Sequence, residues 1–206
     1  MTLLKRLLAF AGAAVFAVAV HAAGEAPDAL IKQVSTDVLA AVKADKNIQA
    51  GDTQRVMGLV DTKVMPHVNF QRMTASAVGR FWRTATPDQQ KRLQEEFKIL
   101  LVRTYAGALA QVRDQTVALK PMRSNPSDTE VIVRTEVRGS GDPIQLDYRL
   151  EKADAGWKIY DVNVMGIWLV ENYRNSFAQE IGNNGVDGLI AKLAERNKAA
   201  GSGAKS

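Results

Sequence analysis

The spacing of the apolar residues changes twice along this chain, and each change limits the folds that it can adopt. Up to about Asp114, large apolar residues recur every three or four positions, which is the spacing of amphipathic helices. From Thr116 to Met165 they alternate with polar residues, as in strands that bury one face. From Val170 the helical spacing returns. The order helices, strands, helices predicts an α+β fold.

Four strands are predicted in the central region, at residues 116–120, 130–138, 144–151 and 157–165. Short turns such as Gly139 to Pro143 and Ala153 to Gly156 favour an antiparallel meander. The polar alternates indicate that one sheet face is wet or lined by a ligand, and that the other is covered. We therefore expect a curved four-stranded antiparallel sheet, packed against a bundle of helices and enclosing an apolar cavity.

The helical regions carry their own start and stop signals. A first helix opens at Ala26-Pro27-Asp28, a second runs from Asp52 to Pro66, and a short third covers residues 70–78. Thr86 to Gln89 has the pattern of a capping box, so a long helix is predicted from there to about Val112. Two helices are expected at the end of the chain, separated by a break at residues 182–185.

The first 22 residues have the pattern of a secretory signal. Lys5-Arg6 precedes an apolar run over residues 7–20, and small residues follow at cleavage spacing, so we expect cleavage after Ala22, with Ala23 as the alternative. An uncleaved anchor helix is the alternative reading of the segment. The predicted division is a signal peptide over 1–22, a single domain over 23–196 and a flexible tail over 197–206.

Charge and cysteine content limit the classes of function. The chain has no cysteine, which excludes disulfides, thiolate nucleophiles and cysteine metal sites. The formal net charge of +5 becomes +3 once Lys5 and Arg6 are removed, and the remaining basic residues are scattered. Nucleic-acid binding requires a basic patch, so no nucleic-acid partner is expected.

Residues suited to catalysis are scarce. His67 is the one histidine after the predicted cleavage site, and it follows Pro66, where a surface or capping role is expected. No G-x-S-x-G motif, P-loop, dinucleotide fingerprint or metal-ligand spacing is present, so no catalytic residue, metal site or cofactor is predicted. One alternative uses Tyr160 and Asp161 as an acid–base pair in a small pocket enzyme of ketosteroid-isomerase shape. Otherwise Asp161 caps a helix or pairs with an arginine such as Arg149 or Arg174.

Several blocks of sequence resemble the toluene-tolerance (MlaC) family. They are GRFWRTATPDQQ at 79–90, LVRTY at 101–105, WKIYDV at 157–162, Gly166-Ile167 leading to NYRNSF at 172–177, and GVDGLI at 185–190. The blocks occur in the family's order and span nearly all of the mature chain. Trp168 stands where family members often carry a small residue.

The resemblance implies a soluble periplasmic carrier of phospholipid rather than an enzyme. Such a carrier shuttles lipid between an outer-membrane lipoprotein–porin complex and an inner-membrane ABC transporter with an MCE-domain component, which supplies ATP hydrolysis. The acyl chains would lie in the apolar cavity, with phospholipid as cargo and no cofactor. We expect a monomer. A third alternative is an adaptor without a ligand, in which the apolar residues form only a core.

Sheltering a phospholipid requires a large apolar surface. Each methylene removed from water contributes about 0.8 kcal/mol, so two acyl chains of roughly 15 methylenes require shelter worth on the order of 20 kcal/mol. A cavity lined by a dozen large apolar side chains meets that requirement. The candidates are Phe81, Phe97, Leu101, Tyr105, Val131, Val133, Leu146, Tyr148, Val162, Val164, Met165, Ile167, Tyr173 and Phe177.

Overall fold

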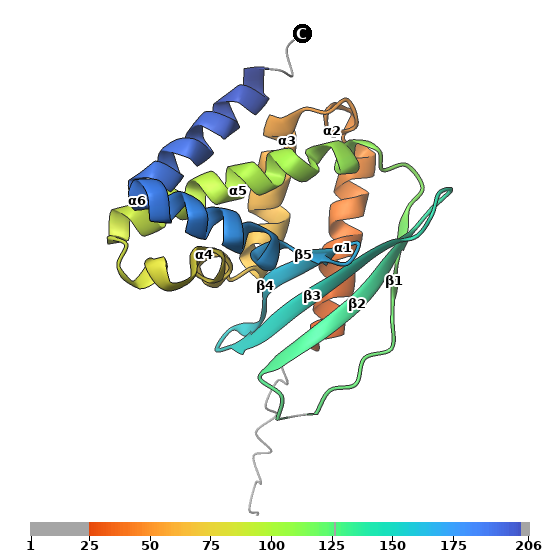
Figure 1. The fold of residues 1–206 in the computed structure, drawn as a ribbon. Helices are drawn as coiled ribbons and strands as arrows, with labels where there is room; N and C mark the ends of the chain where they lie inside the picture. The colour runs from red at the N-terminus through yellow and green to blue at the C-terminus, as the bar shows by residue number, and fades with distance from the viewer. Residues whose placement is uncertain (1–24, 126, 203–206) are drawn as a thin grey trace, which may run out of the picture.

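The computed structural model describes residues 25–125 and 127–202, and it confirms the α+β class (Figure 1). The predicted signal peptide lies outside these residues, as do residues 203–206. None of the helices in the described ranges combines the length and the apolar run that crossing a bilayer requires. The helical elements before the sheet are α1 (Pro27–Ala44), α2 (Lys46–Gln49), α3 (Thr53–Leu59), η1 (Val60–Val64), η2 (Met65–His67), α4 (Phe70–Val78), η3 (Gly79–Arg83) and α5 (Pro87–Ala110).

The first half of the chain forms shorter and more numerous helical elements than the sequence predicts. A one-turn helix, α2, replaces part of the expected turn, because the carboxylate of Asp45 accepts the backbone N–H groups of Asn47 and Ile48. The predicted helix over 52–66 consists of α3, the π-helical turn η1 and the 3₁₀ turn η2. The change of helix type precedes Pro66, which lacks an N–H and disfavours helix in the residue before it.

The long helix α5 begins as the sequence predicts. The backbone N–H of Gln89 donates to the hydroxyl of Thr86 at 3.2 Å, and the backbone N–H of Thr86 donates to the side-chain carbonyl of Gln89 at 3.0 Å. This reciprocal capping box satisfies two donors that the first turn would otherwise leave unpaired.

The sheet is antiparallel throughout, in the order β1-β2-β3-β4-β5. Its strands are β1 (Thr116–Leu119), β2 (Glu130–Arg138), β3 (Ile144–Ala153), β4 (Gly156–Val164) and β5 (Ile167–Trp168). The four predicted strands are present, and β5 is an addition: Ile167 pairs with Val164, and Trp168 pairs with Asn163. A bulge in β4 leaves Tyr160 without a partner on β3, because Leu150 pairs with Ile159 and Arg149 with Asp161.

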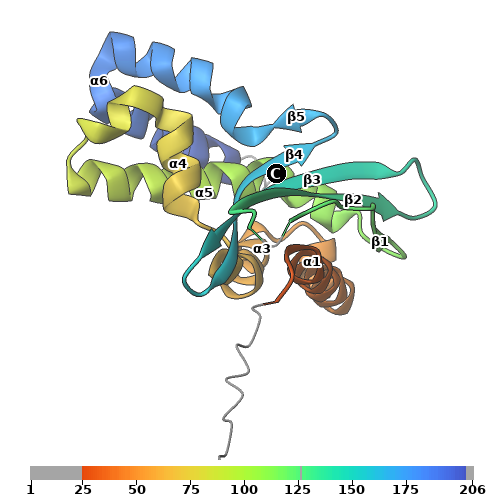
Figure 2. The same ribbon diagram turned by 90° about the horizontal axis from the view of Figure 1, so that it is seen from below.

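The helices cover one face of the sheet and extend past its β4 edge. Figure 2 shows α1 and α3 beneath the sheet, α4, α5 and α6 at one end, and the opposite face open. On the covered face, Val133, Leu150 and Ile159 pack against Leu30 and Ile31 of α1. The other face carries the polar alternates, of which those on β2 are largely exposed, whereas Asp147, Asp161 and Asn163 near β5 are buried.

The C-terminal helix α6 (Leu169–Ser202) is divided where the sequence predicts a break, and it extends further along the chain than expected. Gly185 has non-helical backbone angles and separates two helical segments, within the break expected at residues 182–185. The second segment continues through residues 197–202, which form part of the tail that was expected to be flexible. Asn197 is buried, and its amide donates to the backbone carbonyl of Glu96 at 3.0 Å and to the Glu96 carboxylate at 2.7 Å.

Candidate functional site

An apolar cavity of about 180 Å³ lies where α5 faces η1, α4 and β4. Apart from Lys98 and Tyr105, every side chain in its wall is aliphatic or a hydrocarbon ring or thioether. The lining residues are Val56, Val60, Val64, Met65, Val68, Phe70, Met73, Lys98, Leu101, Val102, Tyr105, Leu109, Val162 and Leu169.

Helical periodicity places most of this wall. On α5, Leu101, Tyr105 and Leu109 are four residues apart and therefore lie on one face. Val56 and Val60 share that spacing on the opposite wall, across the junction of α3 with η1. The π-helical turn is notable because such turns occur mostly as single interruptions of α-helices, often at functional sites.

Three of the predicted site residues lie in this cavity: Leu101, Tyr105 and Val162. Burial raises the pKa of the Tyr105 hydroxyl, and the neighbouring Tyr173 adds to that effect. Tyr105 therefore lies between the cavity and the aromatic cluster behind it.

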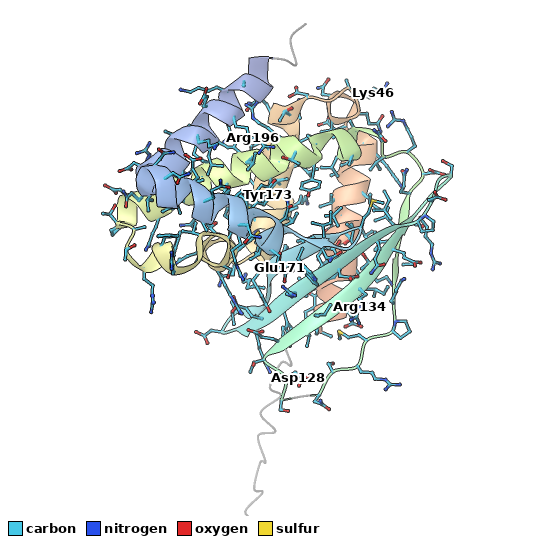
Figure 3. All side chains as sticks on the ribbon, viewed as in Figure 1. Lys46, Asp128, Arg134, Glu171, Tyr173 and Arg196 are labelled. Carbon is cyan, nitrogen blue, oxygen red and sulfur yellow. The ribbon has the colours of Figure 1, made fainter. Side chains whose placement is uncertain are left out.

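Of the five other predicted aromatic residues, Phe81, Phe97, Tyr173 and Phe177 belong to that cluster and do not line the cavity. The ring of Phe97 lies 5.1 Å from that of Tyr173 and 5.2 Å from that of Phe177, both edge to face. Figure 3 shows Tyr173 on α6, where this helix passes α5. Phe81 packs against the same cluster. Phe70 connects the two regions, because it lines the cavity and its ring lies 5.9 Å from that of Phe97.

The remaining predicted residues are on the sheet. Val131 and Val133 are buried between the sheet and α1, and Tyr148 packs beside them. Burial raises the pKa of the Tyr148 hydroxyl. Leu146 and Val164 are half-buried and pair with each other across β3 and β4.

Met165 and Ile167 lie outside the cavity, at the turn between β4 and β5. Met165 is 70% exposed and Ile167 is 58% exposed. Met165 has a φ of 51° and Gly166 a φ of 91°, so a tight turn directs the chain back into β5. Ile144, at 39% exposure, stands beside them at the start of β3, since Gln145 accepts the N–H of Met165 at 3.0 Å.

The sequence interpretation missed most of the wall opposite α5. Val56, Val60 and Val64 lie in the helix predicted from Asp52 to Pro66, in which no residue was predicted to bind lipid. Met65, Val68 and Met73 carried no signal beyond being apolar. Lys98 was missed because a charged residue on an amphipathic helix usually faces solvent.

A larger hollow of about 570 Å³ lies elsewhere, at the β3–β4 hairpin. It is lined by Leu30, Pro66, His67 and the hairpin, together with the charged residues Glu25, Lys152, Asp154 and Lys158. Its charged wall is unsuited to hydrocarbon chains, because burying unpaired charges beside them is unfavourable. We therefore assign the candidate site to the smaller apolar cavity.

The predicted acid–base pair does not face the cavity. Asp161 lies on the sheet face opposite to α1, where the first turn of α6 covers it, whereas Val162 lines the cavity. The hydroxyl of Tyr160 donates to the carboxylate of Glu130 at 3.0 Å. Asp161 is fully buried and pairs with Arg149 at 3.0 Å, as the structural alternative from the sequence expects.

Burial raises the pKa of Asp161, while the backbone N–H groups of Val170 and Val162 and the guanidinium of Arg149 act in the opposite direction. The Asp161 carboxylate therefore stabilises the start of α6 through the hydrogen bond from Val170. Among the described residues, no three His, Asp or Glu side chains gather in a way that could hold a metal ion.

The fold is shared with a solved phospholipid-binding protein from Ralstonia solanacearum, determined in complex with a phospholipid. That chain is 50% identical, superposes with a TM-score of 0.82, and is matched over 98% of its length and 84% of this one.

Two curated relatives are similar along most of their length. The toluene tolerance protein ttg2D of Pseudomonas putida is 25% identical over 185 residues, covering 86% of each chain. The intermembrane phospholipid transport system binding protein MlaC of Haemophilus influenzae is 20% identical over 173 residues, covering 82% of this chain and 81% of that one. The profile of the MlaC protein family matches residues 32–195. With a match that spans most of its length, this chain belongs to the MlaC family.

Proposed function

We propose that this protein is a periplasmic phospholipid carrier that shelters acyl chains in the cavity between α5, η1, α4 and β4. The observation that carries the proposal is an almost wholly apolar cavity between helices and sheet, in a fold shared with a protein solved in complex with a phospholipid. The apolar side chains of the wall make non-directional hydrophobic contacts, which suit flexible hydrocarbon chains.

The cavity has to widen to hold its cargo. An engineered cavity of about 150 Å³ accommodates a molecule the size of benzene. A space of about 180 Å³ therefore accepts only part of one acyl chain. The bound form would recruit further predicted residues, and Leu146 and Val164 are suited to this because they are half-buried on the sheet face that continues from Val162.

The exposed residues Met165 and Ile167 stand at the outer end of this apolar face. Val162 and Val164 alternate along β4, and Val164 pairs with Ile167. In the proposed function this face continues the shelter outward as the cavity widens. Phe81, Phe97, Tyr173 and Phe177 support the cavity wall from behind, and Val131, Val133 and Tyr148 extend it if α1 moves away from the sheet.

We further propose that the carrier exchanges lipid with an outer-membrane lipoprotein–porin complex and an inner-membrane ABC transporter that has an MCE-domain component. Support comes from the name of the Haemophilus influenzae relative, which is the binding protein of an intermembrane phospholipid transport system. In this role the protein performs no covalent chemistry, and the transporter supplies the energy.

Extraction tests the proposal directly. Protein purified from a cell envelope fraction is extracted with organic solvent and analysed by mass spectrometry, and delipidated protein is then mixed with phospholipid vesicles and separated from them. We expect co-purified phospholipid and uptake that approaches a fixed ratio of lipid to protein. Protein that carries no phospholipid and takes none from vesicles would rule out the carrier and favour an adaptor.

A further inference from the structure

Lys98 is the one charged side chain among the described residues of the cavity wall. Its aliphatic stem lines the apolar space, while its ammonium lies 2.8 Å from the carboxylate of Asp61. The side chains of Lys98 and Asp61 are 25% and 46% exposed, so the ion pair is at the rim of the cavity and in contact with solvent. A lysine in this position has its hydrocarbon stem against apolar surface and its charge in water.

Asp61 belongs to the π-helical turn η1, on the opposite side of the cavity from α5. Within the described part of the chain, the Asp61–Lys98 pair is the one side-chain hydrogen bond or ion pair that joins η1 to α5. None of the five residues of η1 is fully buried. This wall is therefore held to α5 by a partly exposed ion pair and by half-buried valines, Val60 and Val64.

We propose that Lys98 binds the phosphate group of the cargo lipid, and that Asp61 holds its ammonium while the cavity is empty. This inference rests on the proposed carrier function and identifies the polar contact of that same site. A phospholipid with its chains in an apolar cavity has its phosphodiester at the rim, where the cavity meets water. That is the place of the Lys98 ammonium, which as a compact point charge suits a phosphate oxygen.

Exchange of partners follows from the need to widen the cavity. When acyl chains enter, η1 moves away from α5 and the Asp61 carboxylate separates from the ammonium. An ion pair between exposed, flexible side chains is weak, so it opposes this movement little. The incoming phosphate then replaces the carboxylate, and Lys98 stays neutralised in both states.

The test compares two lipids with the same acyl chains, phosphatidylglycerol and diacylglycerol, which differ in the phosphate group. Binding of each to the full-length mature protein is measured for Lys98→Met, for Lys98→Arg and for the control Lys91→Met, an exposed lysine on the same helix. We expect Lys98→Met to bind phosphatidylglycerol about tenfold more weakly. Diacylglycerol binding should not weaken, Lys98→Arg should retain most of the affinity, and Lys91→Met should match the parent protein.

Three outcomes would overturn the inference. The first is equal binding of phosphatidylglycerol by the parent protein and Lys98→Met, and the second is an equal loss for both lipids. The third is binding of inorganic phosphate alone at Lys98, seen by a chemical shift of its ammonium, without any preference for phosphatidylglycerol over diacylglycerol. Failure of the carrier function itself looks different, because the parent protein would then take up neither lipid.

Asp61→Asn tests the exchange of partners separately. Removing the carboxylate's charge frees Lys98, so uptake of phosphatidylglycerol should be about two- to fivefold faster, which is the range for loss of an exposed ion pair. Diacylglycerol uptake should accelerate by the same factor, because the same wall opens. An unchanged rate for both lipids would show that Asp61 does not hold the cavity closed and would overturn that half of the inference.

Discussion

The buried carboxylate of Asp161 accepts the backbone N–H of Val170 at 3.1 Å, which ties the first turn of α6 to strand β4. The same oxygen accepts the N–H of Val162 at 2.9 Å, and the other oxygen pairs with Arg149 at 3.0 Å. Since Val162 and Leu169 both line the cavity, this carboxylate fixes the geometry of one cavity wall from behind.

Asp161→Ala should be strongly destabilising. The substitution leaves two backbone donors and the Arg149 guanidinium without their buried acceptor, and breaking such a pair costs about 3–5 kcal/mol. The free energy of unfolding measured by urea denaturation should fall by roughly that amount. The control is Asp142→Ala in the exposed β2–β3 turn, which should change stability by less than about 0.5 kcal/mol. Equal stability of the two variants would contradict the role of Asp161.

The elements that the sequence predicts well are those with local signals. The capping box at Thr86 fixes the start of α5, and the alternation over residues 130–138 gives β2 with its observed bounds. Strand β5 was not predicted because two residues are too few to show an alternation of apolar and polar side chains. Its pairing depends on the left-handed conformation of Met165 and Gly166, which no spacing of apolar residues encodes.

The sequence does not distinguish a cavity wall from a core. Phe97 and Leu101 are four residues apart on the same face of α5, and both were predicted to bind lipid. Phe97 is fully buried among aromatic rings, whereas Leu101 is half-buried and lines the cavity. The difference arises from what lies opposite, namely α6 for Phe97 and the π-helical turn η1 for the cavity. Such information resides in tertiary packing, not in periodicity.

Glu130 should contribute to the loss of stability in acid. Hydrogen bonds from Arg72 first, and then from the Tyr160 hydroxyl, lower the pKa of Glu130 below its ordinary value of 4.5. As pH falls below that value the unfolded chain binds a proton before the folded chain does, so stability decreases until the folded carboxyl is also protonated. Glu130→Gln should therefore give a shallower dependence of unfolding free energy on pH between about pH 5 and pH 3.

The effect at Glu130 will be modest, because its side chain is 51% exposed and solvent screens its ion pair with Arg72. Glu95→Gln, the same substitution at an exposed position on α5, is the matched control. A slope for Glu130→Gln that equals the parent slope would show that the Arg72 contact does not influence folding stability.

Two glycines of α6 should respond to alanine in opposite directions. Gly185 has a φ of 71° and a ψ of −180°, a conformation that is essentially restricted to glycine, so Gly185→Ala should cost about 1–3 kcal/mol. Gly182, three residues earlier, is exposed with open space around it, so Gly182→Ala should stabilise the helix by up to about 1 kcal/mol. Urea denaturation measures both. Equal effects would indicate that the kink relaxes into a continuous helix.

Leu101→Trp should separate lipid binding from folding. The larger side chain projects from α5 into the cavity of about 180 Å³, where it occupies the space proposed for acyl chains. The cost of overpacking is about 1–3 kcal/mol and should leave the protein folded, as circular dichroism can establish. Phospholipid co-purifying with the variant, and uptake from vesicles, should fall sharply. Ile132→Trp places the same ring on the open face of the sheet and should carry as much lipid as the parent protein. A folded Leu101→Trp protein with a full complement of phospholipid would mean that the acyl chains lie elsewhere.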